Sequence, residues 1–352
     1  MILFAFLLGL IRASGALAQE PRIDVAQIDR LLQAQVDSGF SGVALLATGD
    51  SIALLRAYDR SATLTPRSAF WIASITKGFT AVAVLKLVEE KRLTLSDSLG
   101  ALLPDVPADK KGITIHQLLT HTAGLGGNYA NLGVTSRSDA IQAILAPALE
   151  HRPGDGYRYS NNNYELLAAI IEVVSGVPWE RNVTDAELIP MHLANTGFGC
   201  RNSSSGTLPP ETEGENSSPC PAGDPSDWAH RGANGMWSTA GDLFRWARSL
   251  SSGHEIDDQV RAAIATPQVE VRREGDTDVS YGYGVRVYTR DGRVVEVTHS
   301  GFGDSGHSGV VRLFPSGVTV LVLSNAGEHG GTTWSSYVAR QIVEEIGPAS
   351  TR

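Results

Sequence analysis

Apolar residues recur along the chain with two different periods, and the period changes from region to region. Near the N-terminal end they fall three and four positions apart over residues 23–36, which predicts an amphipathic helix. Two short apolar runs follow at 42–47 and 52–55, on either side of Gly49-Asp50, and they predict a β-hairpin.

The middle of the chain has helical spacing, and the end returns to strand-like runs. Predicted helices cover 74–90, 115–119, 139–149, 164–174, 243–250 and 334–346, and predicted strands cover 283–288, 294–298, 310–314 and 318–323. Strands at both ends with helices between them predict one sheet built from the two termini, with a helical region inserted. We expect a sheet domain of residues 19–73 and 251–352 and a mainly helical domain of residues 74–250, which includes a loop at 200–220.

The N-terminal twenty residues contain one hydrophobic run. Residues 2–11 have the length of a signal-peptide core and are too few to span a bilayer. Ala16-Leu17-Ala18 offers a small-residue cleavage site, so residues 1–18 are predicted to be a signal peptide and the mature chain to be periplasmic or secreted. An anchored N-terminus is the alternative, because no Lys or Arg precedes the apolar core.

Composition excludes some partners. The formal charge of -9 at pH 7 argues against nucleic acid, since no basic stripe is present to contact phosphates. The two cysteines, Cys200 and Cys220, bracket a segment rich in Ser, Gly, Pro and Glu, which predicts a loop. In an exported chain this pair is expected to form a disulfide, with free thiols as the alternative.

Ser74 and Lys77 form the first candidate for catalysis. They stand three positions apart at the start of a predicted helix, so they share a helix face, and the helix N-terminus adds partial positive charge at the serine. The alternative is a capping serine with a solvated lysine. The neighbouring residues are strongly apolar, however, so Lys77 is expected to be partly buried.

Two further segments carry polar groups that could serve catalysis. Tyr159 and Asn161 are two apart after a turn and could face one cleft, although a turn asparagine beside a half-buried tyrosine is the alternative. The stretch 298–309 contains a G-x-G-x-x-G and a G-D-S-G pattern. A strand follows where a nucleotide site needs a helix, and the chain is too helical for a trypsin-like protease.

Four histidines could suggest a metal site: His116, His121, His299 and His307. No H-E-x-x-H pattern occurs, and His116 and His121 are five apart, so they do not lie one turn apart on a helix. We therefore expect no metal and no cofactor.

Three motifs, in this order, resemble the serine β-lactamase and penicillin-binding-protein superfamily: Ser74-x-x-Lys77, Tyr159-x-Asn161 and His299-Ser300-Gly301. The most similar branch contains class C β-lactamases, D-peptidases and family VIII esterases. The resemblance implies an α/β mixed (α+β) fold, in which helices flank an antiparallel sheet and the site lies between this sheet and a helical domain. It also implies acyl transfer from an acyl-enzyme.

The resemblance assigns roles to single residues. Ser74 is the nucleophile, Lys77 and Tyr159 form the proton relay, and either of the two could be the acylation base. Bringing a lysine pKa from about 10.4 to near 7 costs on the order of 4 kcal/mol, which burial can supply. Asn161 is implied to bind the substrate and orient Lys77.

The third motif is implied to line the substrate cleft. His299, Ser300 and Gly301 bind substrate, and the backbone N–H groups of Ser74 and Phe302 form the oxyanion hole. Class C enzymes carry Lys where this chain has His299, which favours an ester, amide or D-amino peptide substrate over a β-lactam. His299 is expected to gain charge as pH falls from about 7.5 to 5.5. A class C-like β-lactamase and a non-catalytic penicillin-binding sensor are the alternatives, and a monomer is expected.

Overall fold

The computed structural model describes residues 23–127, 130, 132–199, 227–253, 255–303 and 306–350. The predicted signal peptide, both cysteines and Ser305 lie outside these residues, so the expected Cys200–Cys220 disulfide stays a prediction.

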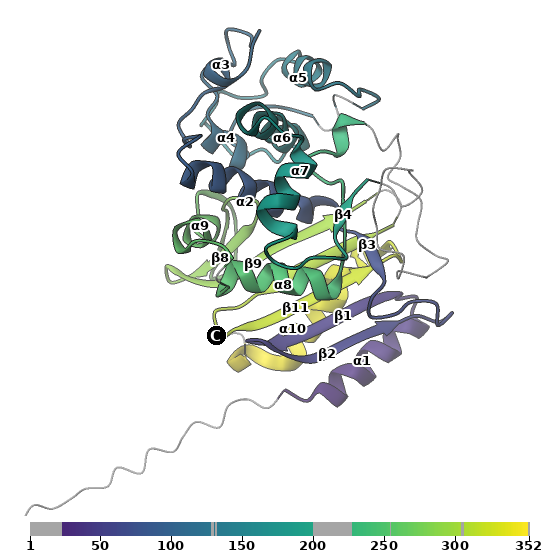
Figure 1. Ribbon diagram of the computed structural model, residues 1–352. Helices are drawn as coiled ribbons and strands as arrows, with labels where there is room; N and C mark the ends of the chain where they lie inside the picture. The colour runs from purple at the N-terminus through teal and green to yellow at the C-terminus, as the bar shows by residue number, and fades with distance from the viewer. Residues whose placement is uncertain are drawn as a thin grey trace, which may run out of the picture.

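One large antiparallel sheet forms the lower part of the molecule in Figure 1. Its eight strands follow the order β2-β1-β11-β10-β9-β8-β7-β6. The strands are β1 (Gly42–Thr48), β2 (Ser51–Tyr58), β6 (Val269–Glu274), β7 (Thr277–Tyr281), β8 (Arg286–Arg290), β9 (Arg293–Phe302), β10 (Ser308–Leu313) and β11 (Val318–Ser324). The N-terminal hairpin joins the C-terminal strands where β1 pairs with β11, which confirms the predicted sheet and the α/β mixed class.

Two strands of this sheet were not predicted from the sequence. Strand β6 is a mostly exposed edge strand, and its alternation is limited to two apolar residues, Val269 and Val271, which is too short to indicate a strand. It pairs with β7 around the turn at Gly275, where φ is +61°. Tertiary pairing places both strands in the sheet.

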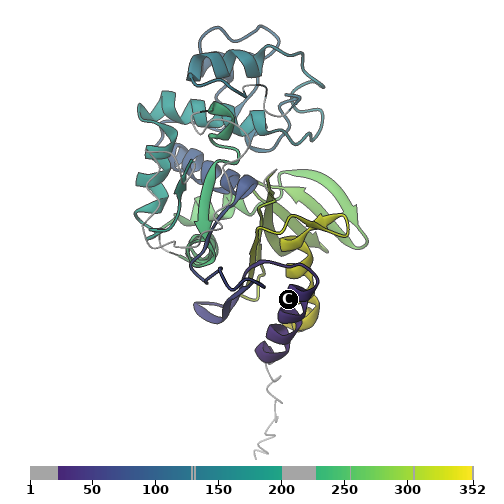
Figure 2. The same ribbon diagram turned by 90° about the vertical axis from the view of Figure 1, so that its right-hand side faces the viewer.

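Helices cover both faces of the sheet. On one face, α1 (Val25–Asp37) and α10 (Trp334–Ser350) lie side by side and enclose an apolar cluster with the sheet (Figure 2). On the other face, α8 (Ala240–Ser251) lies against β1, β10 and β11. The residues in this second layer join the core of the helical region above the sheet.

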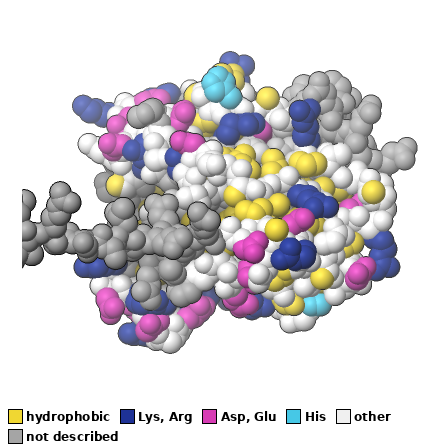
Figure 3. All heavy atoms as spheres, turned by 90° about the horizontal axis from the view of Figure 1, so that it is seen from below, with side chains coloured by type: hydrophobic (Ala, Val, Ile, Leu, Met, Phe, Trp, Pro, Cys, Tyr) yellow, Lys and Arg dark blue, Asp and Glu magenta, His cyan; other side chains and the backbone are white. Residues whose placement is uncertain are grey.

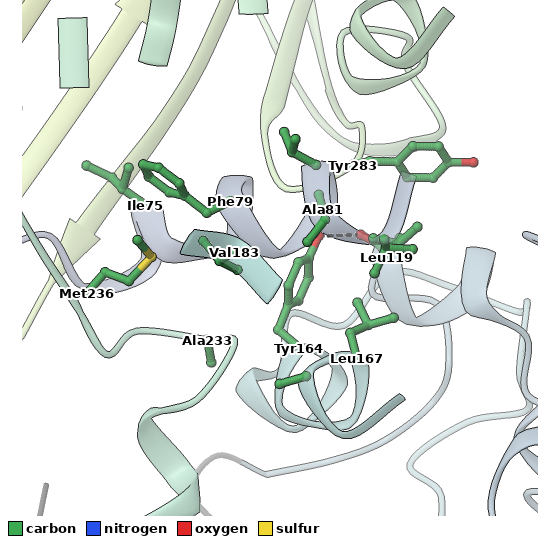
Figure 4. Close-up of a cluster of buried hydrophobic side chains, with 14 of the residues drawn as sticks. Ile75, Phe79, Ala81, Leu119, Tyr164, Leu167, Val183, Ala233, Met236 and Tyr283 are labelled. Carbon is green, nitrogen blue, oxygen red and sulfur yellow. Dashed lines mark hydrogen bonds between the residues drawn. The ribbon is translucent and has the colours of Figure 1, made fainter. Parts of the chain in front are cut away.

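The helical region is centred on α2 (Thr76–Glu89), which is buried along nearly its whole length. Around it lie α3 (Leu99–Leu102), α4 (Ile115–Leu119), α5 (Arg137–Leu145), α6 (Asn161–Ser175), α7 (Trp179–Val183), η2 (Thr184–Leu188), η3 (Trp228–His230) and α9 (Asp258–Ile264). Figure 4 shows Ala81 of α2 beside Tyr164 of α6, within one buried cluster that also contains Phe79 and Leu167. The hydroxyl of Tyr164 donates to the carbonyl of Leu119 over 2.8 Å. Because 11 of the 14 residues of α2 are buried, neighbouring elements surround the helix on most sides.

Two small sheets complete the described fold. Strands β3 (Ala69–Trp71), β5 (Met236–Thr239) and β4 (Gly197–Phe198) pair in the order β3-β5-β4. Strands β12 (Glu328–His329) and β13 (Thr332–Thr333) form a short hairpin. The first of these sheets matters for the site, because β3 leads directly into Ser74.

The surface seen from below mixes hydrophobic side chains with Lys, Arg, Asp and Glu (Figure 3). Such mixing is ordinary for a face in contact with water. Among the helices that the structure describes, none is both long enough and apolar enough to cross a bilayer.

Candidate active site

Ser74 lies in a tight turn between β3 and α2. The turn is a 3-10 helix, η1 (Ala73–Ile75), so Ser74 precedes the α-helix instead of lying within it as the sequence predicted. Ala73 has φ of +44°, a left-handed conformation that is unfavourable for a residue with a Cβ, and it is fully buried. The nucleophile candidate therefore stands on a strained turn that its surroundings must hold in place.

Lys77 lies one turn further along and points back at Ser74. Its buried Nζ donates three hydrogen bonds, to Ser74 Oγ at 3.1 Å, to Asn161 Oδ1 at 2.7 Å and to the Ala233 carbonyl at 2.9 Å. The amine also lies 4.9 Å from the centre of the Tyr159 ring. The structure thus brings four of the predicted site residues together around one amine.

Burial changes the acid–base properties of Lys77. Loss of solvent lowers the pKa of its amine to about 7, against an upward influence from Glu165 and a further downward one from Arg286. Glu165 is a fully buried carboxyl on α6, one helical turn after Asn161. Near neutral pH a substantial fraction of Lys77 is therefore uncharged and able to accept a proton from Ser74.

Tyr159 has the opposite tendency. Burial raises the pKa of its phenol to about 12, although a hydrogen bond with Ser74 and the charge of Arg286 both lower it. At neutral pH the phenol keeps its proton. Tyr159 is thus suited to donate a proton, and Lys77 to accept one.

The third motif comes against Ser74 along β9. A Cβ at Gly301 would overlap the carbonyl oxygen of Ile72 and lie 3.0 Å from the Ser74 nitrogen. Only glycine therefore allows this close approach. Phe302 follows directly, so its amide and that of Ser74 belong to adjoining segments, as the predicted oxyanion hole requires.

His299 belongs to this strand, two residues before Gly301, and is only 3% exposed. Its Nδ1 donates to the Ser300 carbonyl at 2.7 Å, and its Nε2 lies 3.2 Å from the Tyr281 hydroxyl. Burial, with the charges of Arg286 and Lys77, holds the pKa of this imidazole well below 6.5. The expectation that His299 gains charge between about pH 7.5 and 5.5 is therefore wrong.

Arg286 is a functional candidate that the sequence reasoning missed. It opens β8, is half-buried, and has no ion-pair partner among the residues that the structure describes. Its buried Nε also has no hydrogen-bond partner within the described parts of the chain. Its charge reaches the site, because it lowers the pKa values of Tyr159, Lys77 and His299. A charged residue inside the apolar run 283–288 was the available signal.

His121 is a second missed residue. Its backbone is left-handed, with φ of +58°, and its ring is fully buried. Its Nδ1 accepts from the Ser160 N–H at 3.3 Å and from Asn163 Nδ2 at 2.9 Å, and the ring centre lies 4.4 Å from that of Tyr159. The His121 ring therefore packs against the Tyr159 ring and restricts its position. Across the described parts of the chain, no cluster of His, Cys, Asp and Glu could hold a metal ion.

Comparison with known proteins identifies the family of the chain. The Beta-lactamase family model matches residues 28–338. The chain belongs to this family. Two of the three motifs named from the sequence supply the residues that meet at Lys77.

Individual relatives are more distant. Protein flp of Staphylococcus aureus (strain N315) is 32% identical over 195 residues, which cover 51% of this chain and 39% of that protein. The chain thus spans about two fifths of the length of this curated relative. Among solved structures, a penicillin-binding protein from Bacillus halodurans has a TM-score of 0.72 at 23% identity and covers 90% of this chain and 99% of its own.

A D-amino acid amidase from Ochrobactrum anthropi SV3, solved with L-phenylalanine, has a TM-score of 0.73 at 19% identity, with 91% and 97% of the two chains covered. Identities this low establish the shared fold and leave the substrate open.

Proposed function

We propose that the protein hydrolyses an amide or ester bond through an acyl-enzyme on Ser74, in a substrate that carries a carboxylate, such as a D-amino peptide. The observation that carries this proposal is the buried Lys77 amine, with a pKa of about 7 and a distance of 3.1 Å to Ser74 Oγ. Such an amine can activate a serine at neutral pH.

The acylation step follows from these pKa values. Neutral Lys77 takes the proton of Ser74 while Oγ bonds to the substrate carbonyl carbon. The N–H groups of Ser74 and Phe302 stabilise the oxyanion. Tyr159 then gives its proton to the leaving amine or alcohol, the scissile bond breaks, and the proton on Lys77 restores Tyr159. Water then attacks the acyl-enzyme through the same proton transfers. Ser74 Oγ is the leaving group in this step, so Ser74 is freed.

Arg286 supports a carboxylate-bearing substrate. It is a permanent cation beside the site without an ion-pair partner in the described residues, and guanidinium groups bind carboxylates well. The similar fold of a D-amino acid amidase favours the D-amino class. A β-lactam also carries a carboxylate, so β-lactam hydrolysis is the second candidate.

Export and assembly complete the proposal. The predicted signal peptide at 1–18 favours a periplasmic or secreted protein, and a monomer remains our expectation.

A fluorophosphonate probe tests the nucleophile. The probe should label the intact protein, fail on Ser74→Ala and still label Ser305→Ala, because only an activated serine reacts. Intact-mass spectrometry reads the label. Labelling that survives in Ser74→Ala and disappears in Ser305→Ala would contradict the assignment.

Turnover separates an enzyme from a sensor. Steady release of p-nitrophenol from short esters is expected, whereas a sensor would release one equivalent and stop. D-Ala-D-Ala peptides and nitrocefin, assayed beside the esters, then rank the two substrate classes.

A further inference from the structure

Strand β3 is held on its two edges by different kinds of partner. On one edge it pairs with β5, and the N–H of Ile72, just beyond it, donates to the Met236 carbonyl at 3.0 Å. On the other edge no neighbouring strand pairs with it in the described fold. There the N–H of Trp71 donates to Nδ1 of His307 at 3.2 Å. At Trp71, three residues before Ser74, the His307 side chain thus accepts the hydrogen bond that a neighbouring strand would otherwise accept.

His307 belongs to the hairpin between β9 and β10, and this hairpin also carries Phe302. The N–H of Gly303 donates to the His307 carbonyl at 2.9 Å, which closes the hairpin directly after Phe302. A Cβ on Gly303 would overlap the ring of Trp71. The Trp71 backbone and ring are therefore both fixed against the segment that carries one predicted oxyanion donor, while Trp71 itself leads to the other.

The ring of His307 is held in a dry aromatic setting. It is 1% exposed and lies edge-on to Trp237, with ring centres 5.4 Å apart, and 5.8 Å from Phe70. Because Nδ1 accepts a hydrogen bond, the ring proton is on Nε2, which has no hydrogen-bond partner among the described residues. Burial lowers the pKa of His307 to about 4, so the ring remains a neutral acceptor at neutral pH.

The segment that this bond restrains is strained. Ala73, between Trp71 and Ser74, has φ of +44°. A non-glycine residue keeps such a conformation only where the surrounding structure imposes it. The Trp71–His307 hydrogen bond, two residues before Ala73, is one of the contacts that impose it.

We propose that His307 is a positioning residue for the oxyanion hole: it ties Trp71 to the β9–β10 hairpin and thereby fixes the Ser74 and Phe302 amides relative to each other. This inference rests on the proposed function, because it requires those amides to stabilise an oxyanion. The competing interpretation is that His307 only fills space between Trp237 and Phe70.

Two substitutions at His307 separate these interpretations. His307→Asn keeps an acceptor at the position of Nδ1, whereas His307→Leu keeps the volume and removes the acceptor. For a neutral ester, the Leu variant should lose about tenfold or more in kcat with little change in KM, since misplaced donors act on the transition state. Its affinity for a boronic-acid transition-state analogue should fall by a similar factor, and the Asn variant should recover most of both.

Val338→Ala is the matched control. Val338 is fully buried on α10 in the cluster on the opposite face of the sheet, so this variant loses stability while kcat stays unchanged. If the Leu variant does not fold, Gly303→Ala provides a second approach, because its new methyl group pushes Trp71 away from the hairpin. It should lower kcat and boronate affinity in the same way.

The possible failures are distinguishable. Wild-type protein that does not react with the fluorophosphonate at Ser74 contradicts the proposed function and this inference with it. Wild-type protein that reacts, with a Leu variant that is folded and equally active, contradicts the inference alone. An Asn variant as impaired as the Leu variant would show that ring packing matters and the acceptor does not.

Discussion

The Lys77 amine lies within reach of two charges of opposite sign. Glu165 raises its pKa and Arg286 lowers it, while burial, the largest influence, lowers it to about 7. The charged amine is the less stable form in this setting, so the folded protein releases the proton at a lower pH than a free lysine does. Activity that needs the neutral amine should therefore rise with pH and level off above about 7.

Removal of Glu165 and removal of Arg286 should shift the midpoint of the pH–activity profile in opposite directions. Glu165→Gln removes the influence that stabilises the charged amine, so the midpoint of kcat/KM for a neutral ester should move to lower pH. Arg286→Gln removes the influence that destabilises it, so the midpoint should move to higher pH. Profiles between about pH 5 and 9 measure both shifts. Two shifts in the same direction would contradict Lys77 as the base.

Arg286 and His299 differ in how their charge depends on pH. A guanidinium group is positively charged over the accessible pH range, whereas burial holds the pKa of His299 well below 6.5 and keeps its ring neutral. Arg286→Gln should therefore raise KM for a carboxylate-bearing ester by about tenfold at every pH tested, and leave a neutral ester little changed. If KM for the anionic ester instead improves on acidification, and His299→Gln abolishes the improvement, the charge belongs to His299.

At the scale of elements, α2 is positioned by its close contact with α8. Phe79 stacks on Trp246 with ring centres 4.5 Å apart, and Gly78 lies directly beneath the same indole. A Cβ at Gly78 would come within 2.5 Å of the Trp246 ring. The absence of a side chain at Gly78 therefore permits this close approach between α2, which carries Lys77, and Trp246 of α8.

Gly78→Ala tests this packing. Alanine is the better helix former, yet the overlap with Trp246 should lower the free energy of unfolding by about 1–2 kcal/mol. Gly241→Ala is the control, because Gly241 also lies in a helix and has open space around its Cβ position. It should raise the free energy of unfolding by roughly 0.5–1 kcal/mol. Urea titrations measure both, and equal stabilisation by the two would contradict the tight contact.

At the scale of the whole molecule, buried neutral histidines make stability depend on pH. The pKa of His307 is about 4 in the folded chain, against an ordinary value of 6.5 for histidine. Between these values the unfolded chain binds a proton that the folded chain does not. The contribution of neutral His307 to the free energy of unfolding is therefore complete above pH 6.5 and is lost as pH falls through about 4.

The expected decrease in the free energy of unfolding is about 3 kcal/mol between pH 7 and pH 4. Urea unfolding at pH 7 and at pH 4.5 measures most of it, and His307→Asn should show a smaller loss because asparagine does not titrate. An identical loss in both proteins would assign the acid sensitivity to other groups, such as His121 and His299, which burial also keeps neutral.

The sequence alone determined those features that depend on neighbours in the chain. Apolar spacing located α2 and α6, turn residues located the β1–β2 and β10–β11 hairpins, and helical geometry put Ser74 and Lys77 on one face. These are local properties, so a few consecutive residues contain the necessary information. The family resemblance then linked three distant motifs.

Only the tertiary structure decided which charges meet at the site. Arg286 and Glu165 influence Lys77 because β8 and α6 converge on α2, and no pattern in the sequence encodes that convergence. The neutral state of His299 likewise follows from burial, whereas the family resemblance suggested a specificity residue that gains charge below about pH 7.5. A pKa depends on the solvent and the charges that surround a group, and segments far apart in the chain supply both.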